Sequence, residues 1–214
     1  MAIGSPQWMY ASGEDFTIDQ SLRFNDDDSA YLGWTPASAG NRRLWTFSCW
    51  VKRGNSGTGA LCGAYESSTI RDVIRFTTDD ELSLQVIGTG YTTVQKTTVA
   101  KFRDPSAWLH IVVVWDSENG TAGNRVKMYV NGVQQTLTGT DAAGDEDSTT
   151  GNDEAHFVGC RSSDGSASVF YDGCMAEVHF IDGTALTPSS FGETGTYGEW
   201  KPIEVSGLTY GTNG

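Results

Sequence analysis

Acidic side chains clustered in turns are the residues of this sequence best suited to chemistry. The run Asn25-Asp26-Asp27-Asp28 offers carboxylates at the spacing of a hard-cation site, and calcium takes oxygen ligands of this kind. Asp116 opens a second polar loop and offers a further carboxylate. Asp and Asn also favour turns by hydrogen-bonding their own backbone. The sequence therefore predicts a candidate Ca2+ site at Asp26, Asp28 and Asp116, with an ordinary turn as the alternative.

A second group of residues has the chemistry to hold a sugar. Aromatic rings provide platforms for sugar faces, and amide or carboxylate groups bond sugar hydroxyls, often around calcium. The glycan-binding candidates on predicted loops are Tyr31, Trp34, Tyr91, Asn119 and Asn124, beside Asp116. Each of them also suits the edge of a core or a turn, so a purely structural role is the alternative.

Catalytic signatures are missing from the sequence. A retaining glycosidase needs two carboxyl groups about 5–5.5 Å apart, and the nearest approach, from Glu14 to Asp19, precedes the first predicted strand and lacks a suitably placed second Glu. There is no Gly-x-Ser-x-Gly, P-loop or zinc motif. The sequence predicts a protein that is not an enzyme.

Charge and hydropathy exclude two classes of partner. The chain has 27 acidic against 14 basic residues, a net charge of −13, which argues against nucleic-acid binding because phosphate affinity requires clustered Lys and Arg. The sequence contains no run of about 18 apolar residues, the length that would predict a membrane-spanning helix. The first residues, MAIGSPQWMY, have neither the basic start nor the apolar stretch of a signal peptide, so we expect folding in the cytoplasm.

The four cysteines show no metal-binding spacing. Cys49 and Cys174 lie in apolar strand patterns and are interpreted as small buried side chains. A disulfide between Cys160 and Cys174 is a further possibility that spacing leaves open.

Strands must position these residues, and two of them are apolar on both faces. Leu44–Lys52 and Trp108–Trp115 are the strongest strand patterns, so we expect them in mid-sheet, covered by a loop or a partner. His110, within the second, is expected to be a hydrogen-bonded structural residue. Asp72–Val86 and Arg125–Leu137 predict hairpins, the latter with a type I′ turn at Asn131-Gly132.

Further strands and loops follow from local patterns. Ser21–Phe24, with Leu22 and Phe24 inward, is expected to turn back as Ser29–Trp34. Strict alternation over Cys174–Ile181 places Cys174, Ala176, Val178 and Phe180 on one face and Met175, Glu177, His179 and Ile181 on the other. Thr187–Phe191 predicts a short helical turn with a hydroxyl cap. The acidic Thr138–Glu154 predicts a long, mobile, solvated loop.

The domain organisation follows from these patterns. Many glycines and few prolines fit short strands joined by tight turns, and residues 21–214 are long enough for one β-sandwich. Residues 1–20 have no clean period and predict an extended arm. Its apolar residues Trp8, Met9 and Tyr10 are expected to pack on the same sandwich or on a neighbouring subunit.

Two motifs resemble those of laminin-G-like, concanavalin-type jelly rolls. Asp172-Gly173, Glu177-Val178 and Ala185-Leu186 match the DG, EV and AL pairs that recur around their C-terminal strand. Trp108-x-His110 and Tyr129-Val-Asn-Gly132 match their W-x-H and MYVNG segments. The resemblance implies an all-β, concanavalin A-like (laminin-G) sandwich of two antiparallel sheets, with a short C-terminal helical turn.

Longer stretches resemble laminin-G-like proteins of tailed bacteriophages, many of them marine. Ser21–Leu32, Leu44–Lys52 and Met175–Glu193 carry this likeness. It implies a non-catalytic virion structural protein, a tail fibre or a head appendage or decoration, assembled in the host cytoplasm. Expected partners are capsid or tail proteins, further copies of the chain, and a host-surface glycan. Similar sequences carry one more strand beyond the position of Gly214. A calcium-assisted lectin is the alternative function.

Overall fold

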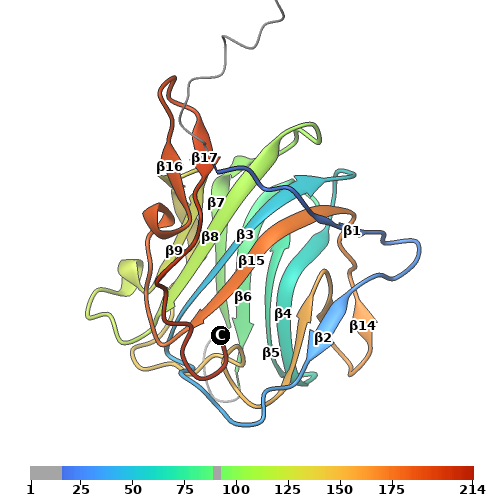
Figure 1. The fold of residues 1–214 in the computed structure, drawn as a ribbon. Coiled ribbons are helices and arrows are strands. Elements are labelled where there is room, and N and C mark those ends of the chain that lie inside the picture. Colours follow the sequence, from blue (N-terminus) through green and yellow to red (C-terminus); the bar gives the residue numbers. More distant parts are fainter. Residues whose placement is uncertain (1–15, 89–92) are drawn as a thin grey trace, which may run out of the picture.

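The computed structural model describes residues 16–88 and 93–214 and shows two large antiparallel sheets packed face to face (Figure 1). The all-β jelly-roll sandwich expected from the sequence is confirmed. The six-stranded sheet has the order β1 (Leu22–Phe24), β15 (Gly173–Asp182), β3 (Leu44–Arg53), β8 (Trp108–Asp116), β9 (Val126–Val130), β10 (Val133–Gln134). The seven-stranded sheet has the order β11 (Leu137–Thr140), β7 (Val94–Lys101), β6 (Glu81–Ile87), β5 (Ile70–Phe76), β4 (Gly59–Ser67), β12 (Ala155–Val158), β2 (Leu32–Trp34).

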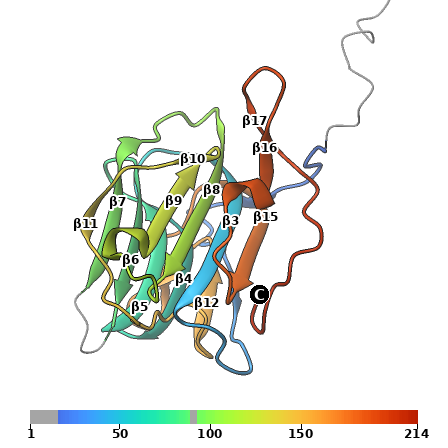
Figure 2. The same ribbon diagram turned by 90° about the vertical axis from the view of Figure 1, so that its left-hand side faces the viewer.

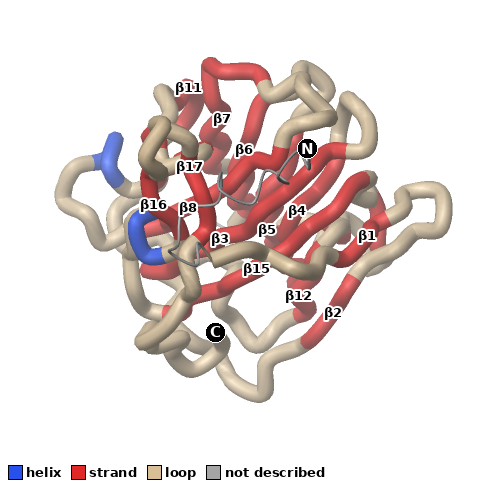
Figure 3. The backbone as a smooth tube through the Cα atoms, turned by 45° about the horizontal axis from the view of Figure 1, so that its top comes forward, coloured by secondary structure: helices blue, strands red, loops and turns tan. Residues whose placement is uncertain are grey.

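Small elements complete the described part of the chain. Two short hairpins are β13 (Arg161–Ser162) with β14 (Ala167–Ser168), and β16 (Gly192–Thr194) with β17 (Trp200–Pro202). The 3-10 helices are η2 (Ala122–Asn124) and η3 (Pro188–Ser190), drawn in blue in Figure 3. Among the described residues, no helix has the length and apolar character needed to cross a membrane.

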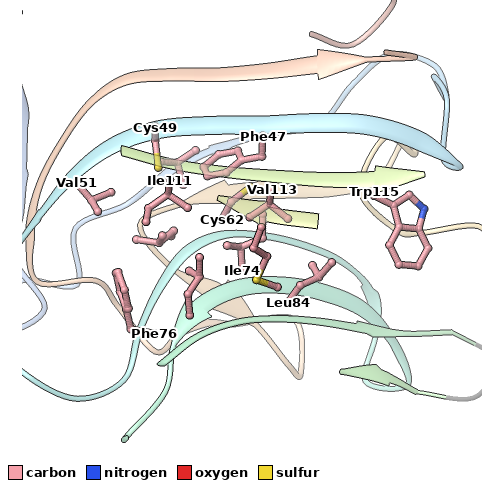
Figure 4. Close-up of a cluster of buried hydrophobic side chains, with 14 of the residues drawn as sticks. Phe47, Cys49, Val51, Cys62, Ile74, Phe76, Leu84, Ile111, Val113 and Trp115 are labelled. Atoms are coloured by element: carbon pink, nitrogen blue, oxygen red, sulfur yellow. The ribbon is translucent and has the colours of Figure 1, made fainter. Parts of the chain in front are cut away.

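The main core lies between the sheets. Alternate residues of β3, from Trp45 to Val51, point inward and are fully buried. Figure 4 shows Phe47 and Ile111 of one sheet facing Ile74 of the other. Trp45 stacks on Trp115 with ring centroids 6.3 Å apart. Each buried aromatic side chain removes about 150–250 Å² from water, so these rings supply much of the stability.

The outer face of the six-stranded sheet is covered by the chain's own C-terminal segment. A second apolar cluster joins Val112 and Ile181 of the sheet to Phe191, with Val205 and Tyr210 packed against it. Figure 2 shows this red segment along the outer side of β3 and β15. The two-sided apolar pattern of Leu44–Lys52 and Trp108–Trp115 is thus explained by an intramolecular cover, and it no longer argues for subunit contacts.

The predicted hairpins and the predicted helical turn are confirmed, since each depends on residues close together in the chain. Asn131 and Gly132 both have positive φ, 49° and 77°, as a type I′ turn requires. The hairpin of β5 and β6 is also present. Residues Pro188–Ser190 form the expected helical turn, but the hydroxyl cap is wrong, because Thr187 makes no side-chain cap hydrogen bond and instead contacts the Ser189 hydroxyl at 2.8 Å.

The expected return of the first strand onto itself is wrong. β1 pairs with β15, whereas β2 pairs with β12 in the other sheet, so the acidic turn connects the two layers. Phe24 is buried as expected, but Leu22 is 56% exposed. The reason is its position at the edge of the sandwich, where the sheets separate and no opposing strand covers it.

Strict alternation along Cys174–Ile181 is also wrong. The register of β15 against β3 shifts between Ala176 and His179, and Glu177 has a φ of +46°. A β-bulge adds one residue and exchanges the faces of everything after it. Met175 and Phe180, predicted on opposite faces, therefore both pack toward the main core, while Ile181 joins the outer cluster.

The acidic segment Thr138–Glu154 is not the solvated loop that its composition suggests. The hydroxyl of Ser148 accepts a hydrogen bond from Nε1 of Trp45 at 2.9 Å, and the backbone N–H of Thr150 donates to Asp72 at 2.6 Å. Five side chains of the segment are buried: Ala142, Glu146, Ser148, Thr149 and Thr150. The backbone hydrogen bonds of this segment to the ends of the strands outweigh its polar composition.

All four cysteines are free thiols, so the disulfide between Cys160 and Cys174 is wrong. Cys49 is buried as expected, and Cys174 is half-buried.

Candidate functional site

An apolar cleft lies at the edge of the sandwich where β1 and β15 of one sheet approach β12 and β2 of the other. Its volume is about 640 Å³. The cleft stays open because β1 and β2 are edge strands of only three residues each. Apolar side chains line most of it: Leu22, Leu32, Trp34, Phe47, Val178 and Phe180. Several remain accessible, with Leu32 50% and Val178 40% exposed.

Trp34 is the aromatic side chain at the mouth of this cleft, and its neighbour His156 holds it in place. The two residues pair across β2 and β12, and their rings stack with centroids 5.2 Å apart at an interplanar angle of 29°. His156 is fixed in turn, since its Nε2 accepts the backbone N–H of Gly151 at 3.1 Å and its Nδ1 donates to the carbonyl of Glu154 at 2.7 Å. Trp34 is therefore held rigidly while 38% exposed.

The imidazole of His156 is neutral in this arrangement. Burial lowers its pKa, and the Glu154 carbonyl only partly opposes that effect. The carbonyl can only accept and the backbone N–H can only donate, so the ring proton is on Nδ1. An uncharged ring behind Trp34 leaves the cleft without a cation at that wall.

A few polar groups complete the lining. Gln20, Glu177 and Asn213 are among them. The Glu177 carboxylate lies 3.3 Å from Nε2 of His179, and Nδ1 of His179 lies 2.8 Å from the Tyr210 hydroxyl. An apolar cleft of a few hundred Å³ with a small number of placed polar groups is the usual form of a small-ligand site.

Tyr31, the second aromatic glycan candidate, lies on the other side of β2. Its ring packs against Phe157 and Phe170 at centroid distances of 6.0 and 6.2 Å, and it lies over Gly33, where a Cβ would approach it to 3.4 Å. Tyr31 is 46% exposed. Tyr31 and Trp34 both border a shallower pocket of about 490 Å³, but only Trp34 also lines the cleft.

The remaining glycan candidates are not brought to the cleft. Asn119 and Asn124 lie in the connection from β8 to β9 of the other sheet, where the Asn119 amide donates to Asp116 at 3.2 Å and its oxygen accepts the N–H of Thr121 at 3.1 Å. These bonds serve the turn itself. Tyr91, like Trp8, Met9 and Tyr10 of the arm, lies outside the described residues.

Asp116 is far from the other two carboxylates of the predicted calcium site, Asp26 and Asp28, which share one turn. Asp26 accepts a hydrogen bond from Asn55, just beyond the end of β3, whereas Asp116 pairs with Leu44 at the start of β3. At about 3.3 Å per residue, the ten residues of β3 keep them roughly 30 Å apart. Asp28 instead accepts the amide of Asn25 at 2.6 Å. Within residues 16–88 and 93–214, no three His, Cys, Asp or Glu side chains are grouped to hold a metal, and calcium binding stays a prediction.

His110 has the structural role expected for it. Its Nε2 lies 2.9 Å from the Ser48 hydroxyl, and its Nδ1 accepts Nε1–H of Trp200 at 3.0 Å. Burial, with a smaller contribution from repulsion by His179, lowers the pKa of His110 to about 4. The ring is neutral and joins the C-terminal segment to the sheet.

Sequence reasoning found Trp34 but missed the residues that complete its surroundings. His156, Glu177 and Asn213 come from distant parts of the chain, and each reaches the cleft only through sheet pairing or the path of the C-terminal segment. The positive φ of Glu177 depends on the bulge, and no local motif marks it.

Comparison with known proteins gives a family and a set of similar folds. A laminin-G-type family model described as "Concanavalin A-like lectin/glucanases superfamily" matches residues 25–190. No curated protein matches the chain.

Three solved structures illustrate the likeness. A native heptameric SAP-like pentraxin from Limulus polyphemus is 17% identical with a TM-score of 0.55, over 81% of this chain and 76% of its own. The CBM40 of Ruminococcus gnavus IT-sialidase, bound to α2,3-sialyllactose, is 14% identical with a TM-score of 0.50, and the match covers 70% of this chain and 90% of the CBM40 chain. Domain 4 of a GH43 extracellular arabinanase from Geobacillus stearothermophilus, in complex with arabinotriose, is 20% identical with a TM-score of 0.51, and the match covers 70% of this chain and 65% of the arabinanase chain. Such low identities show a shared fold alone.

Proposed function

The chain belongs to the concanavalin A-like lectin/glucanases superfamily, and from this premise we propose that it is a carbohydrate-binding domain whose site is the cleft beside Trp34. The observation that carries the proposal is the indole of Trp34, accessible and held against His156 at the mouth of an apolar cleft. A rigid aromatic face binds the apolar face of a sugar with little loss of side-chain entropy. Two of the similar folds hold α2,3-sialyllactose and arabinotriose, which supports sugar binding as the class of function.

In this proposal each wall of the cleft has a separate task. The Trp34 ring stacks on one sugar face, and the apolar floor excludes water from the contact. Glu177 and Asn213 bond hydroxyl groups at the rim of the cleft. The domain binds and releases the saccharide without breaking a bond, in accordance with the missing catalytic motifs.

Tryptophan substitution provides the test. We expect Trp34→Ala to weaken binding of the best glycan from an array by about 30-fold, because an anchoring aromatic residue contributes about 2 kcal/mol or more. Trp108→Ala is the matched control, since Trp108 is 39% exposed, nearly the same as Trp34, but is absent from the cleft lining. Titration calorimetry with and without EDTA measures both the affinity and any calcium requirement. Equal affinities of the two variants would refute the proposed site.

A role in a virion is the second candidate function. The likeness of Ser21–Leu32, Leu44–Lys52 and Met175–Glu193 to tailed-phage proteins supports it, and the two functions are compatible in one fibre or appendage. Neither the family match nor the structural likenesses described above point to bacteriophage particles. Exposed Val99, Val133 and Tyr197 lie outside the cleft and are available for subunit contacts that leave it open.

Light scattering and electron microscopy test this second role. We expect a homo-oligomer in solution, and immunogold label on the head or tail of particles from the producing host. A monomer at all concentrations, together with particles that carry no label, would refute it.

A further inference from the structure

We propose that Arg71, Arg75 and Arg161 form a binding site for the carboxylate or sulfate group of an acidic saccharide on the outer face of the seven-stranded sheet. The site is distinct from the Trp34 cleft. It rests on the proposed function only in taking a saccharide as the carrier of the anionic group.

The register of the strands brings the three arginines to one patch. Arg71 and Arg75 flank Val73 on β5, so the three side chains share one face. Val73 pairs with Gly63 of β4. A Cβ at Gly63 would lie 3.3 Å from both Cα and Cβ of Arg161, so the hairpin of β13 and β14 crosses the sheet directly beside Val73. Three guanidinium groups therefore surround one position of the sheet.

This face is the outer one. On the opposite face of β5 from Val73, Ile74 and Phe76 belong to the core between the sheets. Val73 belongs to neither apolar cluster. Val73 is nevertheless only 2% exposed. The long stems of the flanking arginines are placed to cover it while their charged heads reach water.

The three guanidinium groups lack acidic partners. The Nε atom of each is buried without a hydrogen-bond partner. Across residues 16–88 and 93–214, no carboxylate forms an ion pair with any of them, and Arg71 donates only to the neutral carbonyl of Ser68. Elsewhere in the described residues, four arginines do pair with carboxylates: the surface residues Arg23 with Asp172, Arg43 with Asp147 and Arg103 with Asp80, and the buried Arg53 with Asp80. Arg42 and Arg125 also lack a carboxylate partner in this part of the chain, but their guanidinium groups donate to backbone carbonyls of Ser148, Asn119 and Ala142. Arg71, Arg75 and Arg161 differ in being grouped together with each Nε unpartnered.

Mutual repulsion makes the patch receptive to an anion. Burial, followed by repulsion from Arg75 and Arg71, lowers the pKa of Arg161, and burial lowers the pKa of Arg75. Guanidinium groups still stay charged at neutral pH. A carboxylate or sulfate placed among them would relieve the repulsion and satisfy the free N–H groups, since the planar fork of Arg matches both anions.

The surroundings suit a saccharide. Ser83 lies opposite Arg75 and Gln85 opposite Val73, so their hydroxyl and amide groups share the face of the arginines. Gln95 and Thr97 continue it on β7, where Thr97 donates to Ser83 at 3.1 Å. The Ser83 hydroxyl is fully buried, whereas Gln85, Gln95 and Thr97 are accessible and can bond sugar hydroxyls without repelling an anion. The patch thus combines charge recognition with a hydroxyl-binding surface.

Binding to charged and neutral polysaccharides tests the proposal. The probes are dextran sulfate, polygalacturonate and unmodified dextran, measured by biolayer interferometry at two salt concentrations. We expect wild-type protein to bind at least one charged probe, and Arg75→Gln with Arg161→Gln to weaken that binding at least tenfold. Arg103→Gln is the control, because Arg103 is an exposed arginine already paired with Asp80 at 3.5 Å, and it should leave affinity unchanged. Dextran sulfate alone would assign sulfate, and polygalacturonate alone would assign carboxylate.

Stability measurements separate a binding role from a structural one. Because the double variant removes like-charge repulsion, we expect its Tm to be equal to or above that of the wild type. Arg75→Lys keeps the charge without the fork, and it should lose part of the affinity at full stability. Equal binding by wild type and double variant, an equal loss in Arg103→Gln, or failure to bind either charged probe would overturn the proposal.

The outcome is also independent of the Trp34 cleft. Trp34→Ala should retain polyanion binding, and the arginine variants should retain Trp34-dependent glycan binding. Failure of either site is thus distinguishable from failure of the other.

Discussion

The buried carboxyl group of Asp72 should make the stability of the domain fall as pH rises from about 4 to about 7. Burial raises the pKa of Asp72 from 3.8 to about 7, while hydrogen bonds from Thr150 and Thr149 and the charge of Arg42 act in the opposite direction. One oxygen accepts the Thr150 N–H at 2.6 Å, and the other, Oδ1, is buried without a partner. The folded protein therefore holds a proton that the unfolded chain releases.

The sign and size follow from proton linkage. Between pH 4 and pH 7 the folded state binds more protons at this site than the unfolded state, so its contribution to the free energy of unfolding decreases with pH. Each pH unit across the window is worth at most about 1.4 kcal/mol, which gives an upper limit of about 4 kcal/mol. That is a large part of the 5–15 kcal/mol typical of a domain, so the effect should be measurable.

Asp72→Asn is the perturbation, because it keeps the shape and cannot ionise. Urea denaturation at pH 4.5 and pH 8 measures the free energy of unfolding of both proteins. We expect the free energy of unfolding of the variant, relative to that of the wild type, to increase by several kcal/mol from pH 4.5 to pH 8. Asp27→Asn, at an exposed turn position, is the control and should show no comparable gain. A stability difference between Asp72→Asn and wild type that does not change with pH would refute the reasoning.

Three further predictions concern packing. Gly132→Ala should destabilise the domain by about 1–3 kcal/mol, since φ is +77° and a Cβ would lie 2.5 Å from the Trp200 ring; thermal melts measure this. Ser148→Ala should cost about 1–3 kcal/mol by leaving the buried Nε1 of Trp45 without its acceptor, whereas Ser148→Thr should recover part of the loss in urea titrations. Native protein should show one thiol reactive toward DTNB, that of Cys174, because the other three are buried with raised pKa, and three or more fast-reacting thiols would contradict the buried positions.

Local sequence patterns determined the middle strands of the six-stranded sheet and the turn of its β9–β10 hairpin. The alternation from Trp45 to Val51 predicts that these side chains share a face, and Asn131-Gly132 predicts its hairpin, because both depend on residues that are adjacent in the chain. The same patterns failed at the bulge of Glu177. An extra residue changes the phase of β15 only through its pairing with β3, which no local period records.

Tertiary structure alone decided both proposed sites. Trp34 has His156 behind it because β2 joins β12 in the sheet opposite to that of β1, and Arg161 reaches Arg75 because a hairpin crosses Gly63. Periodicity in the sequence reports which face of a strand is apolar, since that is a property of neighbouring residues. It does not report which strands pair or which segment crosses them, because those choices depend on the total burial and hydrogen bonding of residues far apart in the chain.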